Sequence, residues 1–131
     1  MRIILIASLL IVACACGSKK SFDASKLKVE WELGRNNFDG NGNFLAVLNF
    51  KSDEELPARG WKIFFNLRYH STKLASANPD VIISNVNGEL FTITPSPSFK
   101  PKKSFRMELT GARLIANFQD VPSGFFYVGK D

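Results

Sequence analysis

The first feature of this chain is the alternation of apolar and polar residues from position 27 onward. Between Leu27 and Leu33 every second residue is apolar, and the residues between them are charged. A period of two with charges on one side is typical of a β-strand that has one buried face. The same alternation returns over residues 61–70 and 104–110. No window has the sustained 3.6-residue period of a helix.

Turn signals separate these runs. Asn87-Gly88 predicts a hairpin, because both residue types tolerate positive φ. The segment 44–50 is apolar on both sides and is expected to be a central strand, whereas 51–55 and 71–78 are interpreted as polar connections. The expected strands cover residues 27–33, 44–50, 61–70, 81–83, 90–94, 104–110, 114–118 and 125–128. Seven or eight short strands predict an all-β fold, an antiparallel β-sandwich of the immunoglobulin-like or carbohydrate-binding-module-like kind.

The residues before this domain have the layout of a secretory leader. Arg2 precedes eleven uncharged residues and then a group of small ones. Eleven residues are too few for a transmembrane helix, which needs about 20. The run ends in Ile11-Val12-Ala13-Cys14, which resembles the bacterial lipobox. We therefore expect Cys14 to be lipidated, with Cys16 as the alternative.

This interpretation gives the chain three parts. They are a lipoprotein signal peptide over 1–13, a tether over 14–26 and a β-sandwich domain over 27–131. The protein would be anchored to a lipid bilayer of the bacterial cell envelope, facing the periplasm or the exterior. An ordinary signal peptide, cut nearby without lipidation, is the other interpretation.

Charge and cysteine content exclude several function classes. The 17 basic and 12 acidic residues give a net charge of +5. The basic residues are scattered rather than concentrated in a patch, so nucleic-acid binding is not expected. Both cysteines lie in the leader region, so the domain has no disulfide, thiol nucleophile or cysteine-based zinc site. We expect no cofactor.

Candidate metal and catalytic residues lack the partners that their chemistry needs. Residues 39–43 begin like a calcium loop, but Phe44 and Phe50 stand where that loop needs a glycine and a glutamate. His70 is the only histidine and lies at the end of a predicted strand. Asp53-Glu54 belongs to a solvated charged run. No catalytic residue and no metal ligand is predicted on this chain.

The aromatic residues supply the one candidate for binding. Trp31 and Trp61 lie on the apolar side of alternating strands and are interpreted as core residues. Phe64, Asn66 and Arg68 lie on the opposite side of the strand that contains Trp61. An aromatic ring, an amide and a guanidinium on one face are groups that can stack on a sugar ring and bind its hydroxyls. The alternatives are that the rest of a larger protein covers this face, or that Phe64 is buried in the second half of a bent sandwich.

Several segments in order resemble the N-terminal domain of bacterial chitobiases and other β-N-acetylhexosaminidases of glycoside hydrolase family 20. They are 27–31, 44–48, Leu56-Pro57 with Gly60-Trp61, Phe64-Phe65-Asn66, Asn87-Gly88-Glu89-Leu90-Phe91 with Thr94-Pro95, and 122–127. The resemblance spans about 27–128. It implies a carbohydrate-binding β-sandwich whose partners are chitooligosaccharide-like glycans. Phe126, near the C-terminus, is a second aromatic candidate from the sequence itself.

The same resemblance implies no catalysis on this chain. In that family the catalytic barrel follows this domain and carries an adjacent Asp-Glu pair. The only Asp-Glu pair here, Asp53-Glu54, lies in a predicted loop and matches nothing else of that pattern. A (β/α)8 barrel also typically needs ~250 residues. The expected function is a non-catalytic, lipid-anchored domain that binds or presents N-acetylglucosamine-containing glycans. The alternative is a structural packing domain, the front fragment of a larger β-N-acetylhexosaminidase whose catalytic domain would be its partner.

Overall fold

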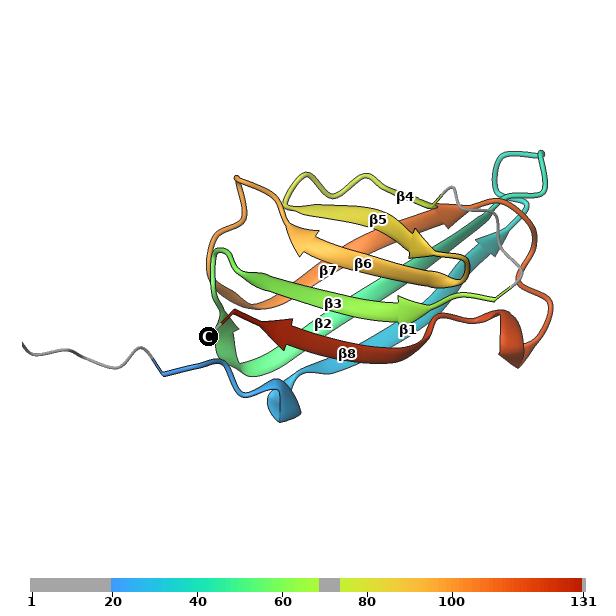
Figure 1. Ribbon diagram of the computed structural model, residues 1–131. Helices are drawn as coiled ribbons and strands as arrows, with labels where there is room; N and C mark the ends of the chain where they lie inside the picture. The colour runs from blue at the N-terminus through green and yellow to red at the C-terminus, as the bar shows by residue number, and fades with distance from the viewer. Residues whose placement is uncertain (1–19, 69–73, 131) are drawn as a thin grey trace, which may run out of the picture.

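The computed structural model describes residues 20–68 and 74–130. In these ranges eight antiparallel strands form two four-stranded sheets that pack face to face (Figure 1). The first sheet has the order β1(Lys28–Asn36), β2(Phe44–Leu56), β7(Lys102–Gly111), β4(Leu74–Ser76). The second has the order β5(Val81–Asn87), β6(Leu90–Pro95), β3(Trp61–Asn66), β8(Ser123–Gly129). The predicted all-β sandwich is confirmed.

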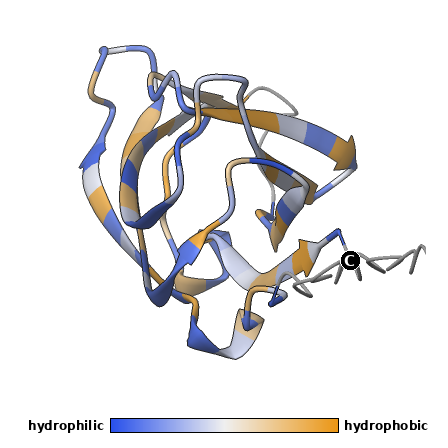
Figure 2. Cartoon of the chain, turned by 90° about the vertical axis from the view of Figure 1, so that its left-hand side faces the viewer, coloured by the Kyte–Doolittle hydropathy of each residue, from blue (hydrophilic) through white to orange (hydrophobic). Residues whose placement is uncertain are grey.

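The core lies between the sheets and is built largely on aromatic side chains. Alternate residues of each strand point inward, and Figure 2 shows the resulting alternation of hydrophobic and hydrophilic positions along the strands. Phe50 stacks on Phe105 with ring centroids 4.4 Å apart, and Phe65 lies 5.6 Å from Phe91. Trp61 is only 2% exposed, and its indole Nε1 donates to the carbonyl oxygen of Pro57 at 2.7 Å. The interpretation of Trp61 as a core residue is confirmed.

The strand β2 is central, as predicted, because it pairs with β1 on one side and β7 on the other. It is longer than the sequence indicated. The charged run 51–55 was expected to be a connection, but it continues the strand to Leu56 after an irregularity in its pairing with β7. Along this extension exposed residues alternate with less exposed ones, so the strand period is kept although the run is polar.

Two other expectations about strands were wrong. The link 71–78 contains the short strand β4, which pairs with the last residues of β7. Residues 114–118, expected to be a strand, form an irregular loop that leads into the 3₁₀ helix η2(Phe118–Asp120). The hairpin at Asn87-Gly88 is confirmed, with Asn87 paired to Leu90 and Gly88 at φ 54° between them.

The residues just before the sandwich pack against it. The 3₁₀ helix η1(Ala24–Lys26) lies between residue 20 and β1, and Lys20 and Lys26 both donate to Oε1 of Glu54, at 3.1 and 2.7 Å. Hydrogen bonds from Lys26, from Lys20 and from the backbone N–H of Asp23 lower the pKa of Glu54 from 4.5 to about 2. The later part of the expected tether is therefore ordered on the domain.

Candidate functional site

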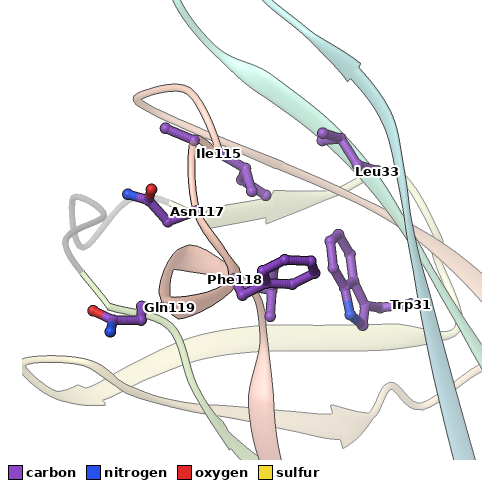
Figure 3. Close-up of a pocket in the computed structure, with 8 residues that line it drawn as sticks. Trp31, Leu33, Ile115, Asn117, Phe118 and Gln119 are labelled. Atoms are coloured by element: carbon purple, nitrogen blue, oxygen red, sulfur yellow. The ribbon is translucent and has the colours of Figure 1, made fainter.

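A groove lies beside the edge strand β1, at the end of the sandwich far from residue 20 (Figure 3). One wall is the inward face of β1, which the second sheet does not fully cover. The other wall is the loop between β7 and β8. Its volume is about 710 Å³. The groove is lined by Trp31, Leu33, Ile115, Ala116, Asn117, Phe118, Gln119 and Val121.

Two aromatic side chains face this groove from opposite walls. Trp31 projects from β1 and is partly exposed, and Phe118 projects from the start of η2 (Figure 3). Phe118 is 95% exposed, although burying a phenylalanine side chain typically stabilises a protein by about 1.5–3 kcal/mol. An apolar ring left in water beside a second aromatic ring is suited to bind a ligand with an apolar face.

The position of the loop is fixed by a two-way contact with the end of β1. The side-chain Nδ2 of Asn36 donates to the carbonyl oxygen of Ile115 at 2.8 Å, and the Ile115 N–H donates to Asn36 Oδ1 at 2.9 Å. Ile115 is 6% exposed and belongs to the hydrophobic core. The loop therefore cannot move away from β1 without breaking both hydrogen bonds and exposing an apolar side chain.

A buried carboxylate sets the conformation of the turn that carries Phe118. Asp120 is 8% exposed, and its Oδ2 accepts from the N–H groups of Ala116 and Asn117, at 3.2 and 3.0 Å. The side-chain Nδ2 of Asn117 donates to the same oxygen at 3.2 Å. The Asp120 N–H returns a hydrogen bond to the Asn117 carbonyl at 3.0 Å. These contacts close a compact turn with Phe118 at its tip.

The polar groups of the groove lie at its rim. Asn117 and Gln119 flank Phe118, and both are exposed. In Figure 3 their amide groups point away from the Trp31 indole. The floor is apolar and is formed by Leu33, Ile115 and Val121. The site can thus bury an apolar surface between two rings, while the two amides stand at its outer edge, where the Asn117 Nδ2 is already hydrogen-bonded to Asp120.

Sequence analysis did not identify this site. Trp31 was assigned to the core, and the structure places it against the core and in the groove at once. Phe118 was assigned to a strand. A signal was present, because Phe118 is a single apolar residue between Asn117 and Gln119, with Asp120 following. That pattern fits a polar turn carrying one exposed ring better than it fits a half-buried strand.

The residues predicted to bind sugar do share one surface, the outer face of the second sheet. Phe64 is paired with Phe126 on β8 and with Thr92 on β6. Asn66 is exposed two residues along β3, and Arg68 follows the strand. The Arg68 Nε lies 3.9 Å from Oε2 of Glu89. Phe64, Asn66 and Phe126 therefore form a continuous patch with Arg68 at its end.

The two aromatic rings of this patch stack face to face. Phe64 and Phe126 are stacked, with centroids 4.7 Å apart and planes within 6°. Sugar rings bind aromatic side chains through the ring face, and this pair leaves fewer free faces than the groove does. Phe126 is nevertheless 50% exposed, and the same face carries exposed Ile82, Val86 and Val128. This surface, called here the outer apolar patch, is defined by Phe64, Ile82, Val86, Phe126 and Val128.

The remaining candidates lie elsewhere. Cys14, Cys16 and His70 fall outside the described residues. The carboxylate of Asp39 accepts hydrogen bonds from the Asn41 N–H and from the side chain of Asn43, so it closes its own loop, and these bonds lower its pKa. Over residues 20–68 and 74–130, no group of three potential metal ligands lies close together, and no helix is long and apolar enough to cross a membrane.

Comparison with known proteins does not assign the chain to a family. No protein-family model matches the chain, and no curated protein matches it either.

Proposed function

We propose that this protein is a non-catalytic, lipid-anchored carbohydrate-binding domain of the β-N-acetylhexosaminidase (chitobiase) type. It binds N-acetylglucosamine-containing glycans at the surface of a bacterial envelope membrane. The primary binding site is the groove between Trp31 and Phe118. The outer apolar patch, with Asn66 and Arg68, is a second contact surface for a longer glycan.

The exposure of Phe118 is the observation that carries this proposal. The turn is held by Asp120, and the loop by Asn36, so the ring is fixed in water rather than left there by disorder. Pyranose rings have an apolar face of C–H groups and a polar edge of hydroxyls. The groove has matching parts, two aromatic rings and an apolar floor with amides at the rim. Its size lies within the usual range for ligand sites, about 300–1,000 Å³.

The leader and the family resemblance support the other parts of the proposal. A lipobox-like Cys14 implies acylation, and each buried methylene contributes about 0.8 kcal/mol to membrane binding. The resemblance to the chitobiase N-terminal domain implies glycans with N-acetylglucosamine. Glycoside hydrolysis usually needs two carboxyl groups across the substrate. None of the residues that line the groove is acidic.

Calorimetric titration with chitooligosaccharides tests the proposal. We expect binding at millimolar or lower concentration. Phe118→Ala is expected to weaken it about tenfold or more, from the apolar contact that is lost. Phe126→Ala is the comparison variant, since it removes a half-exposed ring from the proposed second contact surface on a different face. A stronger effect of Phe126→Ala would transfer the primary site to the outer apolar patch, and no binding by the wild type would refute the function.

A second function is favoured by the outer apolar patch itself. Four of its five residues are between 46% and 51% exposed, with Ile82 and Val86 on the edge strand β5 and Phe126 and Val128 on the opposite edge strand β8 of the same sheet. Apolar patches of this kind often mark protein interfaces. This is what a structural packing domain, the front fragment of a larger β-N-acetylhexosaminidase, would present to its catalytic partner. Protection of Phe126 and Ile82 from solvent in the presence of a hexosaminidase catalytic domain would support that function, whereas unchanged exposure would count against it.

A further inference from the structure

A second depression lies at the opposite end of the sandwich from the Trp31–Phe118 groove. It is formed where β3 begins, where β8 ends and where β6 runs into the following loop. Its volume is about 720 Å³. We call it the basic cleft; it is lined by Arg59, Gly60, Trp61, Lys62, Thr94, Pro95, Ser96, Pro97, Val128, Gly129 and Lys130.

Three cationic side chains converge on this cleft from separate segments. Arg59 comes from the turn before β3, Lys62 from β3 and Lys130 from the end of β8. The segments are joined, because the Lys130 N–H donates to the Gly60 carbonyl at 2.6 Å and Lys62 is paired with Val128. All three side chains are exposed, and none forms an ion pair with another described residue. No acidic residue lines the cleft.

The surface between these cations is apolar and rigid. Val128 is 46% exposed, and Pro95 and Pro97 form the opposite side. The floor is Trp61. Its position is fixed by its hydrogen bond to Pro57 and by an edge-to-face contact with Phe99, whose ring centroid lies 5.2 Å from that of Trp61. An apolar floor ringed by positive charge matches an amphiphile with a negative head group better than a small hydrated anion.

The basic cleft lies at the end of the molecule where the chain enters the domain. Figure 1 places residue 20 and the C-terminal end of β8 at the same end of the sandwich. Phe22 packs on Tyr127, with ring centroids 4.8 Å apart, and Tyr127 is only one residue from Val128. The first described residues of the chain, around Phe22, therefore pack on the strand whose end borders the cleft.

From these observations we propose that the basic cleft docks on an anionic phospholipid surface. The phosphate groups pair with Arg59, Lys62 and Lys130, and Val128 and the two prolines contact the apolar part of the interface. Docking orients the domain with its tether-bearing end toward the bilayer. The inference rests on the proposed lipid anchoring only for this orientation, since the three cations and the cleft do not depend on an acyl chain.

Such docking has a consequence for the glycan site. The turn with Phe118 lies at the end of the sandwich that is remote from residue 20 (Figure 1). When the basic cleft faces the membrane, the Trp31–Phe118 groove opens away from it. A domain that only hangs from a flexible tether would sample orientations in which the groove faces the bilayer. Docking thus keeps the groove accessible to extracellular or periplasmic glycan.

Vesicle binding tests the inference directly. The full chain is prepared with Cys14→Ser and Cys16→Ser, so that neither thiol can be acylated, and its binding to phosphatidylglycerol-containing vesicles is compared with binding to pure phosphatidylcholine vesicles. The test variant adds Arg59→Gln, Lys62→Gln and Lys130→Gln. The control variant adds Arg35→Gln, Lys51→Gln and Arg106→Gln, which remove the same charge from exposed positions of the first sheet.

We expect tighter binding to the anionic vesicles, weakened by salt. A basic residue near an anionic membrane contributes roughly fivefold in affinity, so the triple test variant should lose about a hundredfold and the control variant much less. Equal binding to both vesicle types, or an equal loss in both variants, would overturn the inference. So would tight binding of soluble glycerol phosphate, because the cleft would then be a small-anion site.

The vesicle result is independent of the glycan result. The test variant is expected to keep the wild-type affinity for a short chitooligosaccharide that fills only the Trp31–Phe118 groove, because its changes lie at the far end from Phe118. Glycan binding that is absent while vesicle binding persists would remove the proposed function and leave this inference standing. Vesicle binding that is absent while glycan binding persists would overturn this inference and leave the proposed function standing.

Discussion

Asn36 and Ile115 bind each other through two hydrogen bonds, side chain to backbone, across 79 positions of the sequence. The contact joins the last residue of β1 to the loop that carries Phe118. Both walls of the Trp31–Phe118 groove thus depend on one amide side chain. The groove is a property of the folded domain, and residues that never touch a ligand determine its shape.

Replacing Asn36 tests this dependence. Asn36→Ala removes both hydrogen bonds, so we expect the domain to lose about 1–3 kcal/mol of unfolding free energy, measured by chemical denaturation. Chitooligosaccharide affinity should fall as well, because the loop is no longer held against β1. Asn85→Ala is the matched control, since Asn85 also donates to backbone carbonyls but in the hairpin between β5 and β6. Equal glycan affinity in Asn36→Ala and wild type would contradict the role assigned to the contact.

The turn under Phe118 makes a second prediction. Asp120→Ala leaves the N–H groups of Ala116 and Asn117 without their acceptor, and we expect faster hydrogen exchange at both amides. Asp120→Asn keeps one side-chain oxygen as an acceptor and should be milder. Ile63, in the middle of β3, provides an internal reference whose exchange should not change. Exchange at these amides that is the same in Asp120→Ala as in the wild type would show that the carboxylate does not hold the turn.

The packing of the first sheet can be tested at Gly111. A Cβ atom built at this position would lie 2.6 Å from Cδ2 of Leu74 and 2.6 Å from Cε1 of Phe44. Gly111→Ala should therefore destabilise the domain by about 1–3 kcal/mol, since tight cores resist added volume. Gly40→Ala is less suitable as a reference because of its positive φ, so Ser104→Ala, at an exposed position of the same strand, is the control. A stability unchanged in Gly111→Ala would contradict the placement of β4 beside β7.

Glu54 makes a prediction about pH. Its pKa is lowered in the folded protein from 4.5 to about 2, chiefly by the hydrogen bond from Lys26 and then by that from Lys20. A lowered carboxyl pKa stabilises the folded contact above the unfolded value, and this contribution is lost as the pH falls through the folded value. The contact of residues 20–26 with the domain should thus weaken between about pH 4.5 and pH 2.

Carboxyl carbon NMR shifts measure this titration directly. In the double variant Lys20→Gln/Lys26→Gln the pKa of Glu54 should return toward its ordinary value. A Glu54 carboxyl that titrates at the same pH in the variant and the wild type would show that the lysines do not cause the shift.

The strands of the sandwich follow from local pattern, and the groove does not. In β1 the alternation of Val29, Trp31 and Leu33 with charged residues defines the strand and its buried side. The alternation cannot show that the second sheet stops short of Trp31 and leaves the indole partly exposed. That depends on how the two sheets pack, which is a tertiary property.

The misassigned segments fail for similar reasons. Residues 114–118 contain enough apolar residues for a strand. However, the side chain of Asn36 hydrogen-bonds the backbone of Ile115, and the carboxylate of Asp120 accepts from the N–H groups of Ala116 and Asn117. The sequence pattern does not show which backbone groups these two side chains bind. The extension of β2 through 51–55 was missed because its charged residues do not alternate with apolar ones, although their backbone continues the strand.

The two tryptophans allow the most direct test of the glycan site. They give two indole N–H signals in a proton–nitrogen NMR spectrum, one from Trp31 in the groove and one from Trp61 in the core. On titration with chitotriose, the proposed function predicts that the Trp31 signal shifts progressively to saturation while the Trp61 signal stays in place. A Trp31 signal that does not move while the sugar binds elsewhere, or the absence of any shift at millimolar sugar, would contradict the account.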